Sequence, residues 1–193
     1  PKIGDNSRFS DLHGGDGELR IEKQRLRWDL LEAFAKAANE AGIESTDDFN
    51  SGDNAGVGYF EVTQKSGWRW NSSKAFLRPA RDRKNLTVWT ESHVERLVVE
   101  TAEDGTKRCV GAVVRRGGDA VTVRASREVI LSAGAIGSPH ILQLSGIGPA
   151  PLLKSHGIEV LKDMPGVGEN LQDHLQIRAI YKVENAKSMN TMA

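Results

Sequence analysis

Apolar residues recur at a helical spacing near the start of the chain and alternate with polar residues further along it. The clearest helical pattern predicts a helix from Leu26 to Ala41 whose apolar face covers a core. Its apolar positions are Leu30, Phe34, Ala37 and Ala41. Gly42 suits the position that follows a helix, and Glu32 and Lys36 are spaced to form an ion pair on its surface.

Alternation of apolar and polar residues indicates strands in the middle of the chain. Three such runs cover residues 94–101, 108–115 and 120–125. They are separated by Asp104-Gly105 and by Gly117-Gly-Asp119, which are typical of hairpin turns. The pattern therefore predicts an antiparallel three-stranded meander.

After the meander the pattern changes to an unbroken apolar run. The segment Glu128–Ala133 contains Val129–Leu131, which favours a strand that contacts core on both faces, as in a parallel sheet. Gly134 and Gly137 then mark a turn, because glycine accepts a positive φ and lets a ligand approach the backbone closely.

A helix is expected directly after this turn. Ser138 is a natural N-cap, Pro139 suits the first helical position, and Gly146 ends the helix. A strand, turn and helix in this order place backbone N–H groups and the positive end of a helix dipole beside the strand end, where anionic cofactor groups bind. On the residues alone, a strand-turn-helix unit that packs without a ligand explains the pattern equally well.

Weaker patterns predict further elements on both sides of this region. They are a polar loop at 1–17, strands at 58–64, 86–90, 158–161 and 174–183, helices at 73–80 and 151–156, and a turn at 165–168. Ser72 is suited to cap the helix that follows it. The fold class predicted from these elements is α/β (α+β), with a β-meander followed by a parallel strand-turn-helix.

Composition and charge exclude several classes of protein. The 26 basic and 26 acidic residues give a formal net charge of zero, which argues against nucleic-acid binding and against an electrostatic membrane anchor. No apolar run approaches the roughly 18 residues that span a bilayer, so we expect a soluble, cytoplasmic protein. The single cysteine, Cys109, lies in a predicted strand and is interpreted as a core residue. The sequence has no His/Cys/Asp cluster at metal-ligand spacing, no G-x-S-x-G and no Walker loop.

Longer ordered motifs occupy the segments Gly58–Gly67, Ser72–Pro79, Ser132–Pro149 and Pro165–His174. They resemble motifs of the glucose-methanol-choline (GMC) oxidoreductases, a family of FAD enzymes that oxidise alcohols. The segment Ser132–Pro149 is similar to the family's second signature over a long ordered string of residues. The resemblance extends from about His13 to about Val183.

The resemblance implies a domain organisation. Residues 1–80 would form part of a substrate-binding domain, 81–172 part of an FAD-binding domain, and 173–193 a strand that returns to the substrate-binding domain. None of the G-x-G pairs of this chain carries the third glycine of the dinucleotide fingerprint, and the chain begins at Pro1. We therefore expect the middle of a longer enzyme, with the fingerprint upstream and a catalytic histidine segment downstream.

The resemblance also implies roles for particular residues. It places the backbone of Val94 at the FAD adenine, and Ala133 and Gly134 beside the adenosine half of the cofactor. The main catalytic base is expected outside this segment, with a supporting role for His174 and Gln176 near the substrate. On the residues alone, a histidine that only forms structural hydrogen bonds at a strand start is favoured for His174.

The substrate implied by the resemblance is a small-molecule alcohol. Choline-oxidising members carry a glutamate two residues after the histidine, whereas this chain has neutral Gln176, which favours an uncharged primary alcohol over choline. We expect a dehydrogenase that passes a hydride to flavin, and these motifs do not identify the electron acceptor. The alternative is a non-catalytic module that binds no FAD by itself, since the pyrophosphate loop is missing from these residues.

Overall fold

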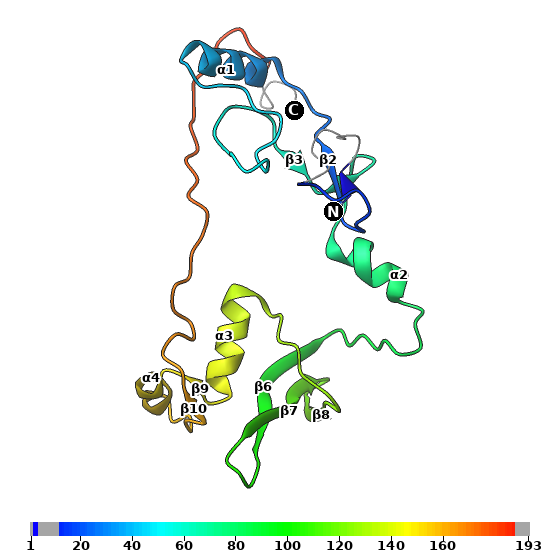
Figure 1. Cartoon of the computed structure of the whole chain (residues 1–193), viewed down its shortest axis with the longest axis vertical. Coiled ribbons are helices and arrows are strands. Elements are labelled where there is room, and N and C mark those ends of the chain that lie inside the picture. The colour runs from blue at the N-terminus through cyan, green and yellow to red at the C-terminus, as the bar shows by residue number, and fades with distance from the viewer. Residues whose placement is uncertain (1, 4–11, 188–193) are drawn as a thin grey trace. The chain divides into compact units, whose positions relative to one another are not determined.

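A computed structural model describes residues 2–3 and 12–187 of the 193-residue chain (Figure 1). The expected loop at 1–17 and the C-terminal end of the expected domain at 173–193 therefore lie partly outside the described residues. The chain divides into two compact units. The first unit comprises Pro1–Thr87 with Ala179–Ala193, and the second comprises Val88–Arg178.

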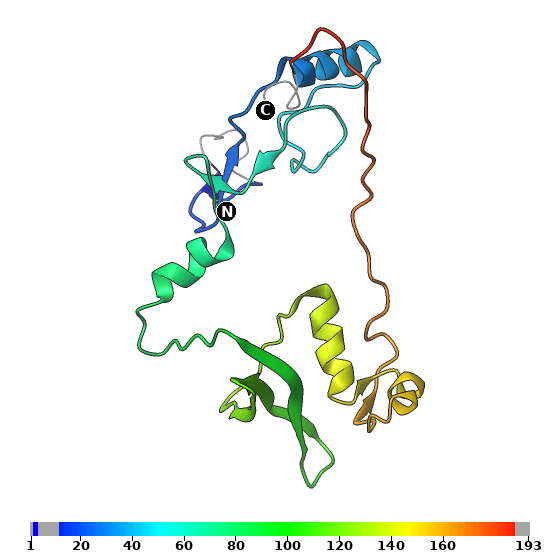
Figure 2. The ribbon, with the colours of Figure 1, turned by 180° about the vertical axis from the view of Figure 1, so that it is seen from behind.

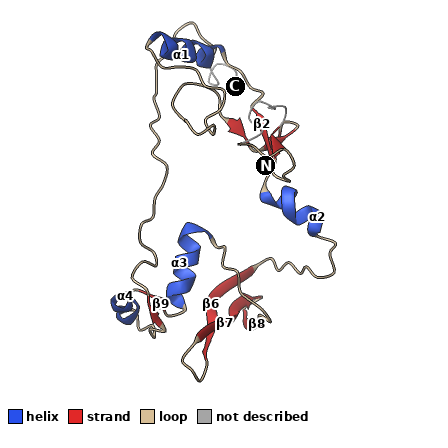
Figure 3. Cartoon of the chain, viewed as in Figure 1, coloured by secondary structure: helices blue, strands red, loops and turns tan. Residues whose placement is uncertain are grey.

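The second unit is built around the predicted meander. Strands β6 (Ser92–Thr101), β7 (Lys107–Arg116) and β8 (Asp119–Arg124) form an antiparallel sheet in that order (Figure 3). Gly105 has a φ of 82°, and Gly117 and Gly118 have φ of 59° and 96°, so glycines fill the left-handed positions of both hairpin turns. The sequence prediction of this sheet is confirmed.

The pairing of β6 with β7 is irregular in two places. Val94 faces Val114 and Arg96 faces Val113, so Glu95 is an extra residue in β6. Further along, Val98 faces Gly111 and Val99 faces Cys109, so the extra residue there belongs to β7. Each β-bulge bends its strand and leaves one residue outside the regular ladder of hydrogen bonds.

Helix α3 (Gly134–Leu144) lies beside β6 in both ribbon views (Figures 1 and 2). The predicted helix is confirmed, but it begins four residues before the predicted N-cap at Ser138, and Pro139 lies inside it. The hydroxyl of Ser138 instead accepts a hydrogen bond from the backbone N–H of Ala133 at 3.0 Å. Ser138 thus supports the helix start from within the helix, much as a residue in the first turn does in a capping box.

The predicted strand Glu128–Ala133 is wrong as a strand of this structure. The segment has no ladder partner among the described residues, and the side chain of Ile130 is 79% exposed. A strand acquires its hydrogen bonds only from a neighbour, so an apolar sequence alone cannot produce one. The same reason applies to the predicted strands 86–90 and 174–183, where Leu175 and Ile177 are 92% and 89% exposed.

A small parallel pairing follows α3. Strand β9 (Ile147–Gly148) pairs with β10 (Lys162–Asp163), which begins after the strand predicted at 158–161. Between them lies α4 (Ala150–Ser155), close to the predicted helix, and the side chain of Asp163 accepts the Ala150 N–H at 2.9 Å. The turn predicted at 165–168 is confirmed.

The described residues of the first unit form short strands and two helical segments. Strand β2 (Arg20–Lys23) pairs with β1 (Lys2–Ile3) and β3 (Glu61–Val62), and β4 (Gln64–Lys65) pairs with β5 (Trp68–Arg69). A π-helical turn, η2 (Ser73–Leu77), continues into α2 (Arg78–Ala80), so a helix near the predicted 73–80 is present. Ser72 does not cap this helix; Asn71 does, through a hydrogen bond from the N–H of Lys74 at 3.1 Å.

Helix α1 (Asp29–Glu40) confirms the clearest helical pattern, starting three residues later than predicted. It covers no core, because none of its residues is buried in the described structure. The predicted pair between Glu32 and Lys36 is not formed. Glu32 instead accepts hydrogen bonds from Arg27 and Tyr59, and Lys36 lies 3.9 Å from Glu40.

Candidate functional site

The start of α3 presents small residues and backbone donors. Ala133 at the N-cap position has no side-chain acceptor for the first N–H groups of the helix, and both Ala133 and Gly134 are exposed. Gly134 has a φ of 85°, and a Cβ built on it would meet no described atom within 4 Å. The space around this turn is therefore open, and its dipole and N–H groups suit an anionic or polar group.

Val94 lies in β6, one residue before the bulge at Glu95. Bulges occur frequently beside binding sites because they free backbone groups from the ladder. This location is compatible with a ligand contact through the backbone of β6. Val94 and the Ala133–Gly134 turn belong to the same unit, and no described hydrogen bond joins them.

Ser145 links α3, which begins at Gly134, to β6, which contains Val94. Its side chain is buried, with 6% of the residue exposed, and its hydroxyl accepts the backbone N–H of Leu97 at 2.8 Å. The same hydroxyl donates to the carbonyl of Ile141 at 2.5 Å. The C-terminal end of α3 is thereby fixed to the edge of β6 that faces away from β7. Sequence reasoning placed Ser145 only within a motif, since its partner lies 48 residues away.

A groove of about 550 Å³ lies beside α3. One wall consists of helix residues and the other of the segment 168–172. Its lining residues are Ala135, Ile136, Pro139, His140, Gln143, Gly168, Glu169, Asn170, Leu171 and Gln172. Both walls come from the two motif segments of the second unit, so the groove lies between them.

His174 and Gln176 follow this groove in the chain and are exposed. The backbone N–H of His174, rather than its imidazole, donates to the carboxylate of Asp173 at 2.8 Å. This is a local bond between the Asp173 side chain and the backbone of the next residue.

Among the described residues of the first unit, one polar cluster surrounds Glu32 and another surrounds Asp48. Arg27 lies 4.2 Å above the ring of Tyr59, whose hydroxyl donates to Glu32 at 3.0 Å. The pKa of the Glu32 carboxyl is held below its ordinary value, first by this hydroxyl and then by the hydrogen bond from Arg27.

The ring of Trp70 is covered by the ammonium of Lys65 at 4.8 Å, so this face of Trp70 is occupied by a cation of the chain itself.

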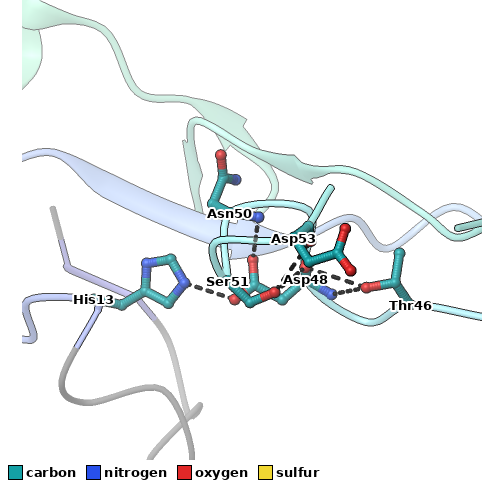
Figure 4. A network of polar contacts seen from close by, with 6 residues as sticks. All are labelled: His13, Thr46, Asp48, Asn50, Ser51 and Asp53. Carbon is teal, nitrogen blue, oxygen red and sulfur yellow. Dashed lines mark hydrogen bonds and ion pairs between the residues drawn. The ribbon is translucent and has the colours of Figure 1, made fainter. Parts of the chain in front are cut away.

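The second cluster surrounds Asp48, which is 3% exposed (Figure 4). Its carboxylate lies 2.7 Å from Nε2 of His13 and accepts the N–H of Asn50 at 2.8 Å. Thr46 and Ser51 bond to its backbone. The cluster joins the start of the first unit to the loop after α1. Sequence patterns gave no signal for it, because an isolated histidine and aspartate 35 residues apart resemble ordinary surface residues.

Within residues 2–3 and 12–187, no group of three or more His, Cys, Asp or Glu side chains is arranged to hold a metal ion. In the same part of the chain, no helix has the length and apolar character needed to cross a membrane.

Comparison with known proteins gives a consistent result. A family model described as GMC oxidoreductase matches residues 7–176. The chain is 42% identical over 180 residues to an alcohol dehydrogenase [acceptor] from Pseudomonas putida, covering 91% of this chain and 32% of the relative. It is 44% identical over 164 residues to an oxygen-dependent choline dehydrogenase from Brucella anthropi, covering 85% and 29%. The chain thus spans about a third of the length of the curated relatives it matches.

Solved structures are similar over the same share of the chain. Pyridoxine 4-oxidase from Mesorbium loti matches with a TM-score of 0.75 and 32% identity, covering 84% of this chain and 31% of the other. An FAD-dependent oxidoreductase from Chaetomium thermophilum matches with a TM-score of 0.76 and 25% identity, covering 86% and 30%. The mixed helix and strand architecture is therefore that of part of a larger fold.

Proposed function

Because the chain belongs to the GMC oxidoreductase family, we propose that it is the central part of an FAD-dependent enzyme that oxidises an alcohol at a CH–OH group. The observation that carries the proposal is the family match over residues 7–176, which includes α3 and both walls of its groove. The relatives named above are an alcohol dehydrogenase and a choline dehydrogenase, which supports this reaction class.

FAD is the cofactor of this proposal, and the residues of the second unit fit it. The open space at Gly134, the small side chain of Ala133 and the exposed N–H groups of α3 would accept the adenosine half. The bulge at Glu95 supports a backbone contact from neighbouring Val94. When bound, flavin supplies the acceptor for the hydride of the alcohol carbon.

The two units correspond in this proposal to two domains. Residues 1–80 and 173–193 belong to the substrate-binding domain and 81–172 to the FAD-binding domain, near the boundaries between the compact units. His174 and Gln176 would then support the substrate from the segment that joins them, while the proton of the alcohol is taken by a base elsewhere in the longer protein. A cytoplasmic location is part of the same proposal.

The proposed substrate is an uncharged primary alcohol. Gln176 supplies hydrogen bonds but no negative charge, so it offers little Coulombic attraction to a quaternary ammonium. Choline is the alternative, supported by the 44% identity to a choline dehydrogenase. Turnover of benzyl alcohol and of choline by the purified enzyme, with an artificial electron acceptor, separates the two.

Flavin absorbance tests the proposal itself. The complete polypeptide that contains these residues should purify yellow, with close to one flavin per chain, and should reduce an artificial acceptor when an alcohol is added. The 193 residues alone should be colourless and inactive, since the dinucleotide fingerprint is not among them. A complete protein that has no flavin and does not respond to added FAD would refute the assignment.

A further inference from the structure

Gln143 lies in the last turn of α3, and its side chain reaches a distant part of the chain. Its amide Nε2 donates to the carbonyl of Val167 at 3.0 Å, across 24 residues of sequence, in a partly buried position. Val167 belongs to the turn at 165–168, which comes directly before the second wall of the groove.

Two glycines leave the space in which this side chain lies. A Cβ on Gly168 would come within 2.8 Å of Nε2 of Gln143, and a Cβ on Gly148 within 3.0 Å of its Cγ. Real Cβ atoms essentially never come as close as 2.8 Å, and a contact of 3.0 Å is tighter than nine in ten of those observed, so the Gln143 side chain would have to move for either substitution. Gly168 also has a φ of 92°, which disfavours any other residue there. The positions of Gly148 and Gly168 therefore depend on the side chain of Gln143, which fills the space beside both of them.

The consequence of this arrangement is the position of the groove wall. The segment 168–172 begins at the residue after Val167, and Gln143 itself lines the groove from α3. The backbone of β9 adds a second attachment, since the N–H of Met164 donates to the carbonyl of Gly148 at 2.9 Å. The amide of Gln143 is thus the side-chain bond that holds the wall against α3 at its start.

We infer that Gln143 is a positioning residue for the substrate side of the enzyme, acting through Val167 on the segment that leads to His174 and Gln176. This inference rests on the proposed function. Gln143 does not touch substrate. Its bond to Val167 fixes the start of the segment 168–172, which leads to the residues that would face a neutral alcohol.

The amide is specifically suited to this role. A carbonyl acceptor requires an N–H or O–H donor, which a glutamine supplies without a charge. A glutamate of the same length offers two acceptor oxygens at neutral pH and would repel the Val167 carbonyl. It regains a donor only when its carboxyl group is protonated.

The first experiment uses the complete flavoprotein with Gln143→Met, which keeps the length of the side chain and removes the donor. Gln64→Met is the matched control, because Nε2 of Gln64 also donates to a main-chain carbonyl, that of Lys23, but at 3.4 Å on an exposed surface. We expect Gln143→Met to raise KM for the alcohol about threefold to tenfold, with kcat and flavin content within about twofold of wild type. Gln64→Met should change none of them.

A second measurement needs neither flavin nor turnover. Backbone amide exchange of the peptide that contains residues 165–174 should be about threefold to tenfold faster in Gln143→Met than in Gln64→Met. In Gln143→Glu, the excess KM over wild type should fall as pH decreases towards the ordinary carboxyl range, because the protonated group can donate again. In Gln143→Met, the KM relative to wild type should not change with pH.

The outcomes separate the inference from the proposed function. An unchanged exchange rate in residues 165–174 overturns the positioning role whatever the enzyme does. Loss of flavin and of thermal stability, with kcat falling in proportion to the flavin content, KM unchanged and no pH trend in Gln143→Glu, overturns it in favour of a purely structural bond. Faster exchange in a protein that has no flavin and oxidises no alcohol retains the attachment but overturns both the proposed function and the catalytic part of the inference.

Discussion

The buried hydroxyl of Ser145 gives the sharpest quantitative prediction. In Ser145→Ala the backbone N–H of Leu97 loses its acceptor at 2.8 Å, in a position where Leu97 is 8% exposed and Ser145 is 6% exposed. The substitution adds no volume and removes one oxygen. Its effect therefore isolates the bond between α3 and β6.

The expected cost follows from the two bonds of that hydroxyl. An unsatisfied buried N–H costs about 1–3 kcal/mol. The carbonyl of Ile141 loses a donor as well, but it still accepts the backbone N–H of Ser145 at 3.1 Å, so its loss adds little. We expect a destabilisation of about 2 kcal/mol for the region that includes Leu97, equivalent to about a 30-fold larger open population.

Native-state hydrogen exchange of the Leu97 amide in the complete polypeptide measures this directly. Ser155→Ala is the matched control. Its hydroxyl also donates to a carbonyl of its own helix, that of Leu152 at 2.7 Å, but it is exposed, and its removal should cost less than about 0.5 kcal/mol. If the Leu97 amide exchanged at the same rate in both variants, the claim that Ser145 fixes α3 to β6 would be refuted.

Three further predictions concern the cofactor, the substrate and a surface pair. Gly134→Ala should weaken flavin binding about tenfold, because alanine is strained at a φ of 85°; retention of the wild-type affinity in a flavin titration would contradict this. Gln176→Glu should raise the ratio of kcat/KM for choline to that for benzyl alcohol about fivefold, and an unchanged ratio would place residue 176 away from the substrate. Tyr59→Phe should raise the pKa of Glu32 towards its ordinary value, measurable by NMR titration, because the hydroxyl is the main cause of the depression. Since a depressed carboxyl pKa stabilises the fold above the unfolded-state value, this contribution should be present at neutral pH, decline as pH falls through the folded-state pKa, and be smaller in Tyr59→Phe.

The parts of the fold that could be predicted from sequence are those whose partners are close in the chain. The meander is such a case, because each strand pairs with the next across a turn in which a glycine such as Gly105 is required. Helices α1 and α4 likewise depend on local spacing and on the glycine that follows each of them.

The wrong strand predictions depend on distant partners, and the wrong cap depends on a local one. The apolar run at Val129–Leu131 becomes a strand only beside another strand, and the described residues supply none. The cap at Ser138 was misplaced because its hydroxyl reaches back to Ala133 instead of opening a new helix.

The candidate site could be predicted from the sequence only in part. Ala133 and Gly134 lie at the start of α3, which begins four residues before the N-cap predicted at Ser138, and the roles of Ser145 and Gln143 could not be read from periodicity. A weak signal for Gln143 exists in hindsight. Gly148 and Gly168 lie outside any helix interior, and the small size of both is explained by one long side chain between them.

The two bulges in the β6–β7 hairpin have a consequence for insertions and deletions. The extra residue of β6 shifts the pairing by one position, and the extra residue of β7 shifts it back before the tip is reached. A substitution that straightened one strand without changing the length of the chain would displace the tip by one residue, and the glycine at position 105 would leave its left-handed place. Gains and losses of single residues in these two strands are therefore expected to occur in compensating pairs among sequences that keep the same tip.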